Sequence, residues 1–531
     1  MALVYPSPNL VLLFSTYLIL MGSILAFAIY EFNSGVAFQV ITLILGGLFF
    51  SFLIFHNIIH VPTSFISFLT EFSIPMVTTL VLVLIYAGMG LKLGADAKTL
   101  RGSGFRVALA GIAMAVMDIV PPAIILGYLC EPLLHWPWFY GALLGTLLGE
   151  TSAAVVVPYL NHLMDLLKER GEDVEHMKKL SSVMKLESTV NSIVLLLFVA
   201  IFYNQIFLNN TTPTLGSFLT TTYQSLAGVL VYHSMVLLFV LVGIPVLVFL
   251  GSKLIVMGVK RKIVDRKKSK LKAYAFFSLN DIVVKKEQTD FSEKQLRMGM
   301  ILYGIVLGIA LLVYESILYL TSFAGFTNIL FTLIGLIYLG FFIGFLFPGG
   351  EKNVLDRDTD ATGERTFTGM MLFHDEFELL VRIVFYFSIG IELGIMLFSP
   401  PAGVQAVPSG ELSGVIILIV IMGPLFLLFR LISGGVGLPI AFYSRYSIVK
   451  SNGKDMGLVA ATMPKGITVA AIAVLILKSG INFGSTIYVL ALVSIIISTL
   501  GFTFISSLGM RSIENRKKKR EQTERTVAKE L

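Results

Sequence analysis

The sequence predicts an all-α polytopic membrane protein with about 13 transmembrane helices, and three observations support this fold class. Of the 531 residues, 56% are hydrophobic and 14% are charged, and the mean hydropathy is +0.85. A soluble domain normally contains about a quarter charged residues. The hydrophobic residues form runs of about 20 or more, enough for a helix to cross roughly 30 Å of hydrocarbon. The alternating pattern of a membrane β-barrel is missing, so the spans are helices.

Thirteen apolar runs define the predicted spans. They cover residues 9–29, 34–56, 72–93, 105–130, 136–162, 184–203, 223–252, 296–319, 327–347, 376–398, 412–444, 457–478 and 483–508. Together they predict one transmembrane domain, residues 1–508, with a long cytoplasmic loop at 258–297. The remaining basic tail, 509–531, is too short to fold as a domain of its own.

The basic residues predict the orientation of these spans. Apart from Arg382, Arg430, Lys465 and Lys478, the 40 lysines and arginines gather in or beside connections that follow odd-numbered spans, or in the tail. The positive-inside rule then places the N-terminus outside and the C-terminus in the cytoplasm of a cell membrane. The net charge of +7 is thereby explained by topology and contact with the lipid bilayer, and it does not indicate nucleic-acid binding.

Two spans contain residues that interrupt a helix. Polar and helix-breaking residues occupy 149–158 in the fifth span and 462–468 in the twelfth. Non-helical backbone at membrane depth is tolerated inside protein or around a cavity, where substrate sites of transporters lie. The two spans are seven apart and therefore run in opposite directions, as do the glycine-rich segments 86–93 and 387–394. This predicts an inverted-topology repeat with two broken helices.

Ionisable residues within the spans cost on the order of 3 kcal/mol or more unless they pair, so each needs a structural or functional reason. They are Asp118, Glu150, Glu187, Asp375, Glu376, Glu378, Arg382, Glu392, Arg430 and Lys465. Glu187 is interpreted either as one half of a structural ion pair with Lys465 or Arg382, or as a proton carrier. Glu376 and Arg382 are expected to neutralise charges around their span.

Two further carboxylates are candidates for ion handling. Asp118 precedes Pro121 and Pro122, so it either caps a broken helix end or lies on an ion path. Glu150 adjoins the interruption of the fifth span and either binds a cation or proton, or has a local structural role. No P-loop, hydrolase triad or metal quartet is present in the sequence, so we expect neither an enzyme nor a cofactor.

Four segments, in this order along the chain, resemble motifs of the cation:proton antiporter superfamily, sodium/hydrogen exchanger type. They are residues 145–158, 186–192, 373–382 and 463–466. The resemblance covers about residues 70–508. It implies thirteen helices, an inverted repeat with crossed broken helices, dimerisation spans interleaved with core spans, and a homodimer.

The resemblance also assigns roles to single residues. Thr151, Ser152 and Asn191 match positions of the ion site, while Glu187 and Lys465 match a structural glutamate and a basic residue. Ser192 stands where the family carries its ion-binding aspartate. A serine carries no negative charge with which to hold a proton or a cation, so the departure affects the group that couples the two fluxes.

Three functions follow as expectations. The first is secondary active exchange of a monovalent cation, sodium first, for protons by alternating access; Glu150 or Asp118 replaces the missing carboxylate. The oxygen ligands are expected from Glu150, Thr151, Ser152, Asn191 and Ser192. The second is a non-exchanging sensor or scaffold on the same fold. The third is transport of another solute, an anion or a neutral molecule.

Overall fold

The computed structural model describes two large parts of the chain and several short pieces. The described residues are 36–56, 58–59, 63–103, 105–152, 156, 160, 163–164, 175–207, 304, 307–308, 330, 333–337, 340–341, 362–398, 410–442 and 452–505. The predicted spans 9–29 and 223–252, nearly all of 296–319, most of 327–347, the loop 258–297 and the tail 509–531 lie outside them.

The described residues are almost entirely helical. These helices are α2 (Val36–Phe55), α3 (Thr63–Phe68), the π-helix η1 (Leu69–Ser73), α4 (Ile74–Ser103), α5 (Phe105–Leu134), α6 (Trp138–Gly149), α8 (Glu175–Phe207), α15 (Thr362–Phe398), α16 (Leu412–Phe442), α17 (Asn452–Ala461), α18 (Ile467–Lys478) and a final helix, Gly484–Ile505. Within these residues, six helices are long and apolar enough to cross a bilayer. The protein is a multi-pass membrane protein; the predicted total of 13 spans stays a prediction.

The predicted and observed helix ends agree best for two spans. The spans 105–130 and 412–444 correspond to α5 and α16 within a few residues. The spans 184–203 and 376–398 are shorter than α8 and α15, which begin at Glu175 and Thr362. Hydropathy detects only the part of a helix that lies in hydrocarbon, whereas helix hydrogen bonding continues through the polar residues before it.

Both predicted helix interruptions are present, and they lie against each other. α6 ends at Gly149, Glu150 is extended, and Thr151 and Ser152 are not helical. α17 ends at Ala461 and α18 begins at Ile467, with non-helical backbone between them. The backbone N–H of Ser152 donates to the Pro464 carbonyl at 2.9 Å, which joins the two interruptions directly. The inverted repeat that would relate them stays a prediction.

One expectation about helix continuity is wrong. α5 is continuous through Pro121 and Pro122, so Asp118 lies in mid-helix and caps no broken end. The backbone of this region packs on the glycines of α6: a Cβ on Gly145 would meet the Pro122 carbonyl, and one on Gly149 would meet that of Asp118. Close packing by a neighbouring helix is a setting in which a membrane helix tolerates proline.

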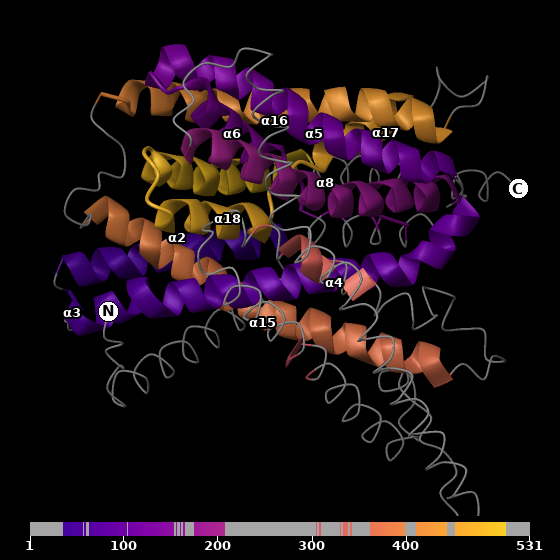
Figure 1. Ribbon diagram of the computed structural model, residues 1–531, viewed down its shortest axis with the longest axis horizontal. Coiled ribbons are helices and arrows are strands. Elements are labelled where there is room, and N and C mark those ends of the chain that lie inside the picture. The colour runs from indigo at the N-terminus through magenta and orange to yellow at the C-terminus, as the bar shows by residue number, and fades with distance from the viewer. Residues whose placement is uncertain are drawn as a thin grey trace, which may run out of the picture.

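The described helices form two groups. α2 and α4 both pack on α15, and this set is called the α15 group. α5 packs on α6, α8 and α16, and α17 packs on α16; this set is called the α5 group. α18 touches α6 as well as α4 and α15. Figure 1 shows α4 and α15 in the lower half of the view, α5, α8, α16 and α17 in the upper half, and α18 between them.

Many of the exposed large apolar side chains among the described residues lie on α5 and α16. Large apolar side chains such as Leu109, Ile124, Ile416 and Val420 are exposed there. Side chains of this kind suit a helix face in contact with lipid. Asp118 on α5 and Arg430 on α16 are buried instead, and they belong to the site.

Candidate functional site

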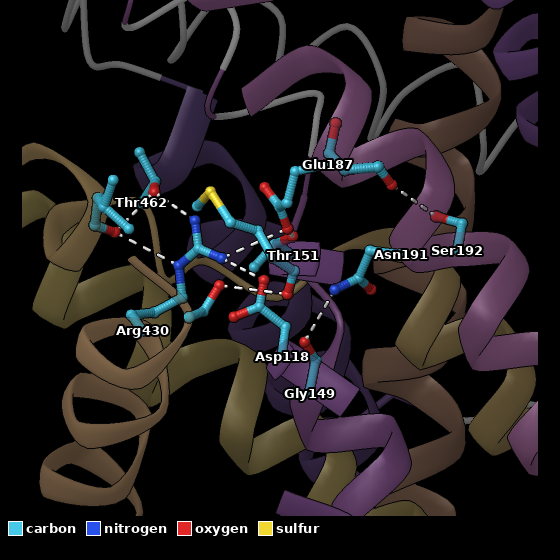
Figure 2. A network of polar contacts seen from close by, with 12 residues as sticks. Asp118, Gly149, Thr151, Glu187, Asn191, Ser192, Arg430 and Thr462 are labelled. Carbon is cyan, nitrogen blue, oxygen red and sulfur yellow. Dashed lines mark hydrogen bonds and ion pairs between the residues drawn. The ribbon is translucent and has the colours of Figure 1, made fainter. Parts of the chain in front are cut away.

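Arg430 lies at the centre of a buried polar network, although α16 carries no other charged residue. Its Nη1 atom is 2.5 Å from Asp118 Oδ2 on α5 and 3.3 Å from Glu187 Oε1 on α8. Its Nη2 donates to Thr462 Oγ1 at 2.8 Å, and its Nε donates to the Val459 carbonyl at 3.3 Å (Figure 2). A buried guanidinium needs such partners, because desolvation costs more than a single contact returns.

The same network reaches both helix interruptions. Thr151, in the interruption after α6, donates its hydroxyl hydrogen to Glu187 Oε1 at 2.6 Å. Thr462, in the interruption after α17, contacts Arg430 and donates to the Val459 carbonyl at 2.7 Å. One arginine therefore connects α5, α8 and α16 with the two segments of non-helical backbone.

Two further buried charges, Glu150 and Lys465, lie where α18 begins. Glu150 Oε2 accepts a hydrogen bond from the backbone N–H of Gly466 at 2.8 Å, and Gly466 is the N-cap residue of α18. The helix N-terminus carries partial positive charge and favours a carboxylate there. Lys465 is also buried; its Nζ lies 4.8 Å from the ring centroid of Phe426, and its backbone N–H donates to Ser498 Oγ at 3.0 Å.

Asn191 and Ser192 lie on α8 beside the first interruption. Asn191 Nδ2 donates to the Gly149 carbonyl at 3.3 Å, and its Oδ1 is buried without a hydrogen-bond partner in the part of the chain that is described. Ser192 Oγ donates to the Ser188 carbonyl one turn earlier, at 3.2 Å (Figure 2). Asp118 Oδ1 is a second buried oxygen without a partner there.

The five predicted cation ligands are thus all buried around the interruptions. Their hydrogen bonds, however, go to different partners. Glu150 faces Gly466, Thr151 faces Glu187, and Ser192 bonds within its own helix. The interpretation that Glu150 replaces the missing carboxylate requires it to reach Ser192. In this conformation each of the two has a different hydrogen-bond partner.

The ion pairs differ from those expected. Glu187 pairs with Arg430, where the sequence interpretation had placed Lys465 or Arg382. Arg382 pairs with Glu378 one turn earlier on α15; the side chain of Glu376 lies outside the described ones. Sequence reasoning recognised Arg430 as an intramembrane charge and gave it no role. The sequence did contain an indication of this role, because a single arginine in an apolar helix must find its charge partners on other helices.

The charges of this site do not balance. Among the described side chains around the two interruptions, Asp118, Glu150 and Glu187 are acidic, and Arg430 and Lys465 are basic. When all five are ionised, one negative charge is left over in a region that excludes water. Asp118 Oδ2 and Glu187 Oε1 both contact the same nitrogen atom of Arg430. The two carboxylate oxygens therefore lie close to each other. No group of three or more His, Cys, Asp or Glu residues that could hold a metal ion occurs in the described ranges.

Comparison with solved structures identifies the fold. The sequence matches no family model and no curated protein. Among solved structures, the chain is similar to the sodium proton antiporter MjNhaP1 from Methanocaldococcus jannaschii, with 16% sequence identity and a TM-score of 0.51. The match covers 94% of this chain and 99% of the antiporter. The protein therefore has the cation:proton antiporter fold, the fold expected from the four sequence motifs.

Proposed function

We propose that this protein is a secondary active transporter that exchanges a monovalent cation, sodium first, for protons by alternating access. The observation that carries the proposal is the single excess negative charge among the five buried ionisable groups at the helix interruptions. A proton or one monovalent cation neutralises that charge equally well. Occupation by one makes the other unfavourable, and this competition couples the two fluxes.

The contacts favour Asp118 as the carrier, ahead of Glu150, which the sequence interpretation had placed first. Asp118 shares its guanidinium nitrogen with Glu187, and its Oδ1 has no hydrogen-bond partner among the described atoms. Glu150 is held by the N-terminus of α18, which stabilises its ionised form whether or not an ion is bound. Glu187 is fixed by Thr151 and Arg430, which suits a structural role.

The cation is expected to bind to oxygen atoms close to Asp118. Asn191 Oδ1 has no hydrogen-bond partner among the described residues. The amide nitrogen of Asn191 donates to the Gly149 carbonyl, and the Cα of Gly149 packs on the Asp118 backbone. Thr151, Ser152 and Ser192 offer hydroxyl oxygens from the surrounding segments. Uncharged and carboxylate oxygens are the ligands that hard cations prefer.

The experiment measures proton flux into proteoliposomes under imposed sodium, potassium and lithium gradients. We compare the wild type with Asp118→Asn and Glu150→Gln. Glu131→Gln is the matched control, because Glu131 lies on α5 like Asp118 but is exposed. Flux lost only in Asp118→Asn supports Asp118 as carrier; flux lost only in Glu150→Gln assigns the role to Glu150. No cation-dependent flux in the wild type contradicts exchange and favours the sensor, scaffold or other-solute alternatives.

The proposal includes assembly and orientation. We propose a homodimer in the cell membrane, with the N-terminus outside and the C-terminus in the cytoplasm. The distribution of basic residues supports the orientation. Light scattering of the detergent-solubilised protein tests the dimer, and protease accessibility of tags at the two termini in intact cells tests the orientation.

A further inference from the structure

A second ionic contact lies at the opposite end of α18 from Glu150. Lys478 is the last residue of α18, and its Nζ is 2.8 Å from Glu392 Oε1 on α15. The same ammonium donates to the Thr70 carbonyl in η1 at 3.2 Å. The Glu392 side chain is 3% exposed and that of Lys478 38% exposed, so a buried carboxylate is neutralised by a lysine that water can reach.

Glu392 belongs to the α15 group, and Lys478 lies on α18, which contacts α4 and α15 of that group and α6 of the α5 group. The connection after α18 is fixed to the α5 group, because the Phe483 ring lies 5.2 Å from that of Trp136 and 5.1 Å from that of Tyr140. On α15, Gly390 and Gly394 pack closely on α2. Glu392 lies between them in sequence and points away from that face, toward α18. The ion pair therefore bridges the α15 group and the α5 group.

The surroundings suit a contact that opens and closes. Tyr488, on the final helix, donates its hydroxyl hydrogen to the Ile389 carbonyl of α15 at 3.1 Å, one turn from Glu392. The acceptor Thr70 lies in a π-helix, an element found mostly as a single turn and frequently at functional sites. The contacts that Lys478 and Tyr488 make here are polar, and water can replace each of them.

We propose that Lys478 and Glu392 form a gate contact, which holds the α15 group and the α5 group together at this end of α18 and is closed in this conformation. Opening the site toward this end requires Lys478 to leave Glu392. The proposal rests on the proposed function in one respect: the opening is a step of the transport cycle. The closed contact itself requires no exchange activity, so the two are tested separately.

The test uses a cysteine reporter inside the bridged interface. Cys130 is the only cysteine of the chain, and replacing it with alanine gives a cysteine-free background. Ser388→Cys then places a thiol one turn before Glu392 on the same face of α15, where Ser388 is buried. Labelling by a water-soluble maleimide is measured on the purified full chain in detergent, without an ion gradient.

We expect slow labelling in the background protein and labelling faster by about tenfold in Lys478→Met and in Glu392→Gln, since either change removes the charge attraction. Lys478→Arg keeps the charge and is expected to label at the background rate. Lys179→Met is the matched control, because Lys179 on α8 is a half-buried lysine that stacks on Phe442 of α16, so this contact lies within the α5 group.

The outcomes decide between the proposals. Unchanged labelling in both Lys478→Met and Glu392→Gln overturns the gate contact, and so does an equal increase in Lys179→Met, which would indicate general loosening. Lys478→Met keeps the test valid if Glu392→Gln fails to fold, because Lys478 is partly exposed. Proton flux is measured on the wild type and on the same variants: faster labelling in the variants, together with no flux in the wild type, supports the contact and contradicts the exchange function.

Discussion

Asp118 and Arg430 are 312 positions apart in the sequence, and their side chains meet at 2.5 Å in the interior of the protein. Each lies in a long apolar helix, α5 or α16, that exposes large apolar side chains along much of its length. The ion pair links these two apolar helices, because an unpaired charge in the membrane interior is strongly unfavourable. Glu187 makes this pair a triad and produces the imbalance on which the proposed exchange depends.

Removing the guanidinium is expected to destabilise the protein strongly. Arg430→Met leaves Asp118 and Glu187 buried without a cation, and breaking a buried pair in this way costs about 3–5 kcal/mol. Thermal unfolding in detergent measures the loss. The double variant Arg430→Met with Asp118→Asn restores part of it, and a double variant less stable than Arg430→Met would contradict the pairing.

Thr151→Val tests the link between the first interruption and α8. The change keeps the shape of the side chain and removes the hydroxyl that donates to Glu187, a hydrogen bond to a charged group worth about 1.5–3 kcal/mol. Thr151→Ser keeps the donor and serves as control. We expect lower thermal stability and weaker cation-dependent flux only in the valine variant; equal behaviour of the two variants contradicts the role of the hydroxyl.

Gly149→Ala tests the close approach of α6 to α5. A Cβ at this position would meet the Asp118 backbone, so the alanine variant must push the two helices apart, at a cost of about 1–3 kcal/mol. Gly435 on α16 has open space around its Cα, and Gly435→Ala is expected to leave stability unchanged or slightly raised. Equal melting temperatures for the two variants would show that α6 and α5 do not pack as described.

The competition between protons and cations predicts a pH dependence of transport. If one excess negative charge accepts either ion, each unit fall in pH raises the apparent KM for the cation about tenfold, at pH values where the carrier is mostly protonated. Maximal flux at saturating cation changes much less. Initial rates over a series of cation concentrations at several pH values measure this; a KM that does not vary with pH contradicts a shared site.

The sequence was sufficient for features that local chemistry determines. Hydropathy located the helices of the described chain, since each must bury or expose a continuous apolar surface over the thickness of the bilayer. The two interruptions were visible because proline, glycine and polar residues replace leucine at membrane depth. The four motifs indicated the fold that the similarity to a solved antiporter supports.

The partners of the buried charges depended on the tertiary structure. Sequence patterns identified Glu187, Lys465 and Arg430 as charges in need of neutralisation, but no pattern along the chain relates α8 to α16. The prolines of α5 suggested a break that packing against α6 prevents. Glu392 and Lys478 likewise meet only because α15 and α18 lie side by side.

What the sequence alone determined is therefore the class of molecule, most helix positions and the location of the broken backbone, because the bilayer imposes these requirements on each segment separately. What only the tertiary structure decided is that Asp118 and Glu187 share Arg430, and hence where one negative charge is in excess. Electrostatic energy depends on distances between atoms, and helices far apart in sequence acquire those distances only when they pack.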